Sequence, residues 1–249
     1  MATSAETVEK LAGLLEPAGF TLGTLERVML ALKKPDDPEI MPKAQRGGGV
    51  GGVHLQARHL TNFLLGTAAA DIVSHAASVV PVYRSLVPIR FTHTKTRRRG
   101  EGRTDTESTT FTRWLEPHGD SPPRWKNAEE KNLGEFLDYF ISKHDDIATA
   151  HEKEFYEGRY PIVEFITWRA KPWAEITLDS NIGITKTFVF APQPDLLSPH
   201  VMSSKLARPA GGCFSMPIEV FKILADLARD TERVISQKRL PDAACGKAA

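Results

Sequence analysis

Short hydroxyl side chains and cations gather in the segment that begins at Thr21. Thr21 and Thr24 stand at its start, Arg27 follows one helical turn later, and Lys33 and Lys34 stand at its end. Hydroxyls at a helix start can hydrogen-bond phosphates or base edges, and an arginine can bond a guanine through two N–H groups. Lysines in the last turn of a helix suit phosphates and the negative end of the helix dipole. The pattern therefore indicates contact with a polyanion.

Two further segments offer the same cationic chemistry. The first surrounds a glycine-rich stretch, and the second is the run 90–103, which holds six basic residues against one acid. A flexible basic arm can follow a phosphate backbone or enter a minor groove, and a basic hairpin can lie beside the major groove. The alternative for both is a surface loop whose charges are merely solvated. The candidate phosphate contacts are Lys43, Arg46 and Arg58 in the first segment and Lys95, Arg97, Arg98 and Arg99 in the second.

Charge is distributed unevenly along the 249 residues. The net charge is +1, but residues 1–103 hold 14 Lys and Arg against 9 Asp and Glu, whereas residues 104–249 hold 18 against 22. A net of +5 followed by a net of −4 suits a protein that presents one end to a polyanion.

The chain has no apolar stretch near the roughly 18 residues of a membrane helix and no secretory signal pattern, which predicts a cytoplasmic protein with no membrane partner.

Metal-binding and catalytic patterns do not occur in the sequence. His54 and His59 are five residues apart, which is off the spacing of two ligands on one helix face. Cys213 and Cys245 form no CxxC pair and no disulfide framework. The glycines at 47–52 lack the Lys-Ser/Thr of a P-loop, and no GxSxG elbow is present. We therefore expect no metal, no cofactor and no enzymatic activity.

An enzyme acting on nucleic acid would need carboxylates clustered near a basic patch. Asp105 and Glu107 are the nearby acids that stand close together, and they leave this hypothesis weakly supported. The tryptophans are interpreted as packing residues of a core or a dimer interface.

Apolar periodicity predicts the elements that must position these side chains. Helices have apolar residues every three to four positions and strands alternate apolar with polar residues. The predicted helices are 4–15, 22–34, 55–70, 71–80 (stopped by Pro81), 128–142 and 217–234, and the predicted strands are 162–169, 173–178 and 185–190. The fold class that follows is α+β: an N-terminal helical domain, then a small antiparallel sheet with packed helices.

The first two predicted helices match a helix-turn-helix. Leu11 and the small Ala12 would pack the first helix, Leu22 and Leu25 would contact it from the second, and a connection with Pro17 and Gly19 would form the turn. Two amphipathic helices joined by a short turn also occur in helical domains that never touch DNA, so the basic segments carry much of the prediction.

The chain also resembles a group of uncharacterised bacterial and prophage-associated helix-turn-helix DNA-binding proteins with a basic glycine-rich connection. The resemblance covers roughly half of the chain, and its motifs are moderately specific. It includes the stretch ARHLTNFLLG and, more loosely, residues 132–137 and 172–174. The matching positions are Lys43, Arg46, Gly47, Gly49, Val53, Leu55, Ala57, Leu60, Asn62 and Leu64 to Ala69. The resemblance implies a DNA-binding regulator.

Four segments follow from these observations. Residues 1–90 are predicted to be a DNA-binding region with its basic arm, 91–127 a basic and polar connection, 128–238 an α+β domain for dimerisation or sensing, and 239–249 a disordered tail. The leading hypothesis is a sequence-specific transcriptional regulator that binds double-stranded DNA as a homodimer. The alternative is a phage-derived structural or adaptor protein acting through protein–protein contacts.

Overall fold

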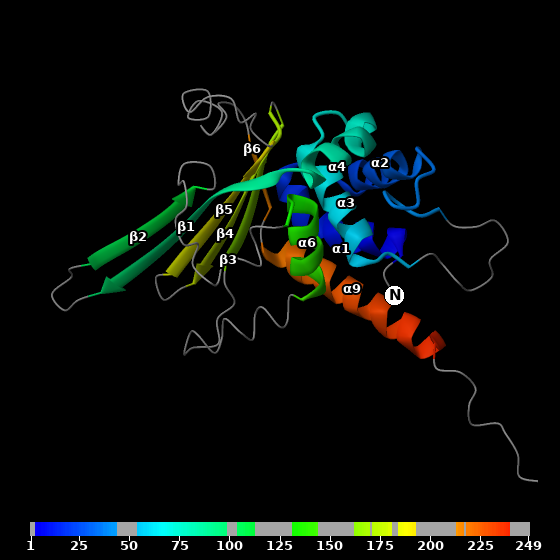
Figure 1. Ribbon diagram of the computed structural model, residues 1–249. Helices are drawn as coiled ribbons and strands as arrows, with labels where there is room; N and C mark the ends of the chain where they lie inside the picture. Colours follow the sequence, from blue (N-terminus) through cyan, green and yellow to red (C-terminus); the bar gives the residue numbers. More distant parts are fainter. Residues whose placement is uncertain are drawn as a thin grey trace, which may run out of the picture.

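A computed structural model describes residues 3–43, 54–98, 104–112, 131–143, 162–169, 171–180, 184–192, 213–216 and 218–239 (Figure 1). The helical elements are α1 (Ser4–Leu15), η1 (Glu16–Ala18), α2 (Leu22–Lys33), α3 (Ala57–Ala69), η2 (Val73–His75), α4 (Ala76–Arg84), α6 (Leu133–Ser142) and α9 (Ile218–Arg239). The strands are β1 (Val87–Arg98), β2 (Thr104–Thr112), β3 (Ile162–Trp168), β4 (Trp173–Ser180), β5 (Ile184–Ala191) and β6 (Cys213–Met216). The α+β class predicted from the sequence is confirmed.

The six strands form one antiparallel sheet in the order β2-β1-β5-β4-β3-β6. One face carries a row of register partners, Phe91, Phe188, Ile176, Phe165 and Met216, that packs into the main core with the helices. Figure 1 shows the helices gathered beside one part of the sheet, with the β1–β2 hairpin projecting away from them. The opposite face holds a smaller buried cluster that includes Trp168 and Trp173, which have the packing role expected for them. Trp114 and Trp125 lie outside the described residues.

Helix α3 lies at the centre of the helical layer. Every residue from Leu60 to Ala70 is buried, and α3 contacts α2, α4, α6, α9 and two strands. A helix that is apolar on nearly all sides is stable only when neighbours surround it. Residues of α1, α2, α6 and α9 share one continuous core with it. The predicted segments 1–90 and 128–238 therefore pack around the same helix and share one core.

Residues 91–127 were predicted to be a polar connection, but the structure has strands in the first part of this segment. Strands β1 and β2 form there, and residues 113–127 lie outside the described part of the chain. Threonine is β-branched and favours strands even without an apolar partner. Hydroxyl pairs tie the strands across the sheet, at 3.3 Å between Thr92 and Thr110 and at 3.3 Å between Thr177 and Thr187.

The helix predicted over 71–80 was wrong in its bounds. Residues 73–75 form η2, and α4 runs from Ala76 through Pro81 to Arg84. Pro81 itself is exposed, while Val80 and Tyr83 on either side of it are buried. Burial of these neighbours holds the helix together although the proline supplies no backbone N–H. The Tyr83 hydroxyl donates to the Trp168 carbonyl, which ties α4 to β3, and burial raises the pKa of Tyr83 to about 12.

Candidate nucleic-acid interface

Helices α1 and α2 are joined by a short turn with defined ends. The Thr3 side chain caps α1 by accepting from the Glu6 N–H. Of the two residues predicted to pack this helix, Leu11 is buried and Ala12 is partly buried against the core. Gly19 ends η1 with φ 87°, a left-handed conformation that glycine adopts without steric cost. Gly19, which the sequence placed in the connection between the two helices, is therefore the residue at which this turn ends.

The first turn of α2 is built by hydroxyl groups. Thr21 is the N-cap, as predicted, and its Oγ1 accepts from the Thr24 N–H at 3.3 Å and lies 3.1 Å from the Thr24 hydroxyl. Arg27 folds back over this turn: its Nε donates to the Gly23 carbonyl at 3.2 Å, and its Nη2 lies 3.5 Å from Thr24 Oγ1. The structure thus brings Thr21, Thr24 and Arg27 together at the start of one helix.

The outer side of α2 faces solvent. Gly23, Arg27, Leu30 and Lys34 share this side, and all four are exposed. A Cβ atom added at Gly23 would meet nothing within 4 Å, so the start of the helix faces open space. Such a row has the exposure that a helix needs to enter a groove of a duplex.

Two expectations for α2 need refinement. Leu22 was predicted to pack against α1 together with Leu25; Leu25 is fully buried, but Leu22 is 45% exposed, so that prediction was wrong for Leu22. The reason is its place as the first residue of α2, next to the Thr21 N-cap, where the chain from 21 to 23 is exposed. Lys33 is half-buried, and burial lowers its pKa, whereas Lys34 is exposed. Lys34 therefore presents its charge to solvent more fully than Lys33.

The remaining cations of the first basic segment pair with carboxylates. Lys43 Nζ lies 2.9 Å from Asp36 Oδ1, and Arg58 contacts the Glu39 carboxylate. All four side chains are exposed or largely so. Both cations thus hold the chain that follows α2 against neighbouring residues. Arg46 and the glycine-rich stretch lie outside the described part of the chain.

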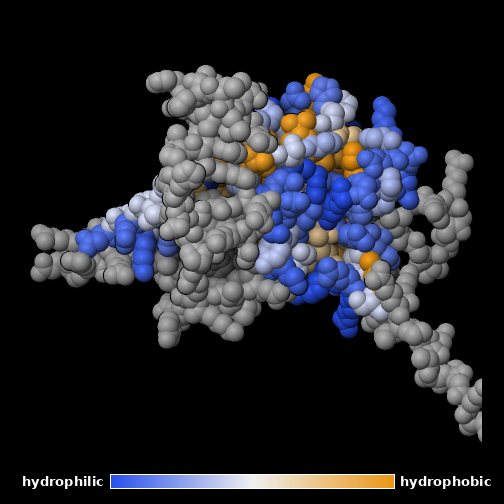
Figure 2. Space-filling view, viewed as in Figure 1, coloured by the Kyte–Doolittle hydropathy of each residue, from blue (hydrophilic) through white to orange (hydrophobic). Residues whose placement is uncertain are grey.

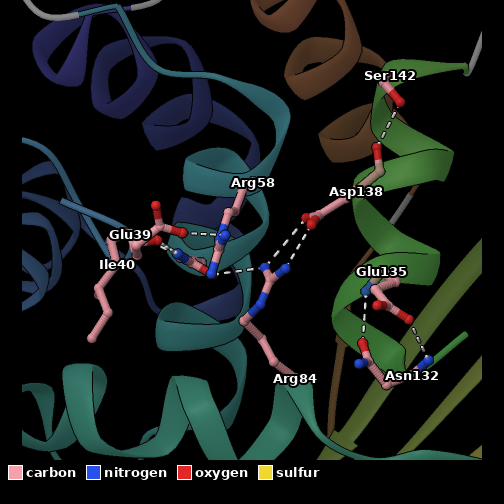
Figure 3. A network of polar contacts seen from close by, with 9 residues as sticks. Glu39, Ile40, Arg58, Arg84, Asn132, Glu135, Asp138 and Ser142 are labelled. Carbon is pink, nitrogen blue, oxygen red and sulfur yellow. Dashed lines mark hydrogen bonds and ion pairs between the residues drawn. The ribbon is translucent and has the colours of Figure 1, made fainter. Parts of the chain in front are cut away.

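A polar network beneath these pairs fixes the same connection (Figure 3). The Asn62 side-chain amide donates to the carbonyls of Glu39 and Ile40 at 2.9 and 2.8 Å. Its oxygen accepts from Arg84 at 2.9 Å, and Arg84 in turn donates to Asp138 on α6. Figure 3 shows Arg84 reaching from α4 into the space between α3 and α6. The network thus joins α3, α4 and α6 to residues 39–40, in the connection that follows α2.

Arg84 and Asp138 are not among the predicted site residues, and Asn62 appears only among the positions that carry the family resemblance. One signal was present. Asn62 is an amide inside the otherwise apolar run around Phe63, and a buried amide of this kind needs hydrogen-bond partners. Its partners come from segments 22 and more residues away, so their identity depends on the tertiary fold.

The second basic segment lies far from α2. Figure 1 places the tip of the β1–β2 hairpin and α2 at opposite ends of the molecule, so the hairpin does not flank α2 as a wing would. Lys95 is half-buried and has Glu107 as its register partner, while Arg97 stands opposite Asp105 and Arg98 opposite Thr104. Two of these three cations thus stand opposite acidic residues in the register of the hairpin. Arg99 lies outside the described residues.

Within the described residues, no group of three or more His, Cys, Asp or Glu is placed to hold a metal ion. None of the helices in that part of the chain is long and apolar enough to cross a membrane. His144 and His151 fall outside it. Of the predicted tail 239–249, the structure describes Arg239, which is the last residue of α9. Known family models, curated proteins and solved structures were compared with the chain, and none matches it.

Proposed function

We propose that the protein is a sequence-specific DNA-binding regulator of transcription that presents α2 to the major groove. It acts without catalysing a reaction, in the cytoplasm, as a homodimer on paired half-sites. The observation that carries the proposal is the open outer row of α2, with Arg27 held over a hydroxyl-lined first turn. The predicted kinship with prophage-associated helix-turn-helix proteins agrees with this role.

Each polar group of α2 has a distinct part in the proposal. Arg27 is the base-reading side chain, since its guanidinium can bond a guanine through two N–H groups. The Thr21 and Thr24 hydroxyls and the first backbone N–H groups of the helix hold a phosphate, which the helix dipole favours. Lys34 contacts a second phosphate from the other end of α2.

The test is a selection of bound duplexes from a randomised library by the full-length protein, followed by anisotropy titration of the enriched sequence. We expect one enriched motif, present as two half-sites about 34 Å apart, and binding that weakens steeply with salt. Arg27→Ala should cost about 1–3 kcal/mol of affinity and relax one base position. Lys34→Ala should reduce the salt slope by about 0.9.

A matched pair of glycine variants separates contact from stability. Gly23→Glu places a carboxylate on the proposed DNA face, and Gly13→Glu places one on the exposed side of α1; neither position is sterically crowded. Gly23→Glu should lower DNA affinity at least tenfold while the protein keeps its stability, and Gly13→Glu should bind as the wild type does. The proposal is contradicted if the selection enriches no motif. It is also contradicted if the affinity for DNA changes neither with salt nor in the variants Arg27→Ala and Gly23→Glu.

A second candidate is an adaptor that acts through protein contacts. Leu30 is 65% exposed in the middle of the outer row of α2, and Ile72 and Val82 are exposed as well. Figure 2 shows apolar side chains reaching the surface in the region where Figure 1 places α4. Leu30→Lys discriminates the two functions: it should strengthen or preserve binding to DNA, but should abolish hetero-assembly if α2 is a protein-binding helix.

A further inference from the structure

A cavity of about 290 Å³ lies where the turn before α2 meets α3, η2 and the β3–β4 connection. Its volume is just below the range of about 300–1,000 Å³ that is typical of small-molecule sites. Phe20 and Val73 give it apolar walls, and Val28 and Ala70, both buried, lie on its inner side. The cavity therefore has space for a ligand with a short apolar group.

Two opposite charges also line this cavity. Arg169 follows β3, and its Nε donates to the Ala68 carbonyl at 3.2 Å, which fixes the side chain against the end of α3. Asp71 follows α3, and its Oδ1 accepts from the Ile72 N–H at 2.8 Å. This bond, followed by the one with His75, lowers the pKa of Asp71, so the carboxylate stays ionised. Both Arg169 and Asp71 are exposed, whereas the apolar inner wall is buried.

We propose that this cavity binds a small apolar α-amino acid. Its carboxylate pairs with the Arg169 guanidinium and its ammonium group pairs with the Asp71 carboxylate. Its side chain lies against Phe20 and Val28. A ligand that carries both charges next to a short apolar chain is complementary to the three kinds of lining at once, whereas a simple anion complements only the cation and a hydrocarbon only the apolar wall.

The same site is joined to α2. Thr24 lines the cavity, and its hydroxyl is the group that lies 3.5 Å from Arg27 Nη2. An amino acid seated in the cavity changes the surroundings of Thr24 and, through it, the position of Arg27. The bound ligand therefore changes the affinity of α2 for DNA. This second step rests on the proposed function, whereas ligand binding does not.

Ligand binding is tested on the full-length protein without DNA. L-valine, L-leucine and L-methionine are titrated one at a time to about 10 mM by calorimetry and by amide NMR shifts. We expect saturable binding of at least one of them, with shifts at Gly19, Thr24 and Asp71. For a leucine binder, 4-methylpentanoate and 3-methylbutylamine, which each lack one charged group, should bind about tenfold more weakly or worse.

Variants locate the site. Asp71→Asn keeps an acceptor for the Ile72 N–H but removes the charge, and Arg169→Gln removes the cation; each should weaken binding about tenfold or more. Asp230→Asn and Arg233→Gln, at exposed positions of α9, are the matched controls and should leave binding unchanged. Circular dichroism confirms that each variant is folded. The proposal is overturned if none of the three amino acids binds saturably. It is also overturned if both half-analogues bind the wild type as tightly as leucine does and Asp71→Asn binds leucine as tightly as the wild type does.

The coupling to DNA is measured separately on the selected duplex, with and without a saturating amino acid. A change in affinity of threefold or more that Asp71→Asn abolishes supports regulation, and no change contradicts it. If the amino acid binds and no duplex is selected, the ligand site stands and the DNA-binding proposal fails. If a duplex binds and no amino acid does, the ligand site alone is wrong.

Discussion

Arg84 of α4 faces Asp138 of α6 with both ends of its guanidinium engaged. Nη2 lies 2.6 Å from Asp138 Oδ2, and Nη1 lies 3.3 Å from Oδ1 and 2.9 Å from the Asn62 side-chain oxygen. The side chains of Arg84 and Asp138 are 17% and 25% exposed. A two-point ion pair that is largely sheltered from water fixes the orientation of both partners.

Arg84→Met is therefore expected to lower the free energy of unfolding by about 2 kcal/mol, because it leaves the Asp138 carboxylate and the Asn62 oxygen without this donor. Chemical denaturation measures the change. Lys10→Met, which breaks the exposed pair with Glu6 one turn away in α1, is the control and should cost less than about 0.5 kcal/mol. Equal effects of the two variants would contradict a special role for the sheltered pair.

Gly134→Ala should disturb the pair of Arg84 and Asp138 by steric crowding of the Arg84 side chain. A Cβ atom at Gly134 would lie 2.8–2.9 Å from three side-chain atoms of Arg84, closer than packed atoms tolerate. The expected loss in the free energy of unfolding is about 1–3 kcal/mol. Gly13→Ala, in open space on α1, should instead gain up to about 1 kcal/mol because alanine favours helices. A gain at both positions would refute the crowding at Gly134.

Thr61→Val is expected to stabilise the protein by about 1 kcal/mol. Thr61 is fully buried on α3, and its hydroxyl has no hydrogen-bond partner in the part of the chain that the structure describes, so valine removes a desolvated polar group at nearly constant volume. Thr67→Val in the same helix is the matched comparison, since the Thr67 hydroxyl donates to the Phe63 carbonyl at 2.8 Å. The thermal midpoint should rise for the first variant and stay level or fall for the second.

His59 is expected to make stability depend on pH. Its Nδ1 accepts from the Gln56 N–H, and its Nε2 donates to the Pro38 carbonyl, so the folded protein holds the neutral ring. Burial is the main cause that lowers the pKa of His59 below 6.5. The unfolded chain thus binds a proton more readily, and the free energy of unfolding should fall as pH drops from 6.5 towards the lower pKa of the folded state.

Denaturation of the wild type and of His59→Gln across this range tests the origin of the slope. The variant should be less stable at neutral pH, but it should lose the part of the pH dependence that arises from His59. An unchanged slope would assign the titration to another group.

Local patterns in the sequence were sufficient for most of the helices and for three strands. The Thr21 cap, the apolar stripe of α2 and the alternation around Phe165 each depend on residues close together along the chain, and these elements lie near their predicted bounds. Strands β1 and β2 could not be predicted in this way. Apart from the start of β1 (Val87 to Phe91) and Phe111 of β2, their residues are polar, mostly threonines and charges, and they form strands by pairing with β5 and with each other.

The sequence by itself determined the α+β class and the exposure of Thr21, Arg27 and Lys34 on α2 and its caps, because helical period and capping depend on residues a few positions apart. Only the tertiary structure decided which charges are neighbours. It paired Arg58 with Glu39 and Arg84 with Asp138, and it brought Asp71 and Arg169 to one cavity from positions nearly 100 residues apart. Contacts of that range arise when the shared core around α3 packs, and no local pattern in the chain encodes them.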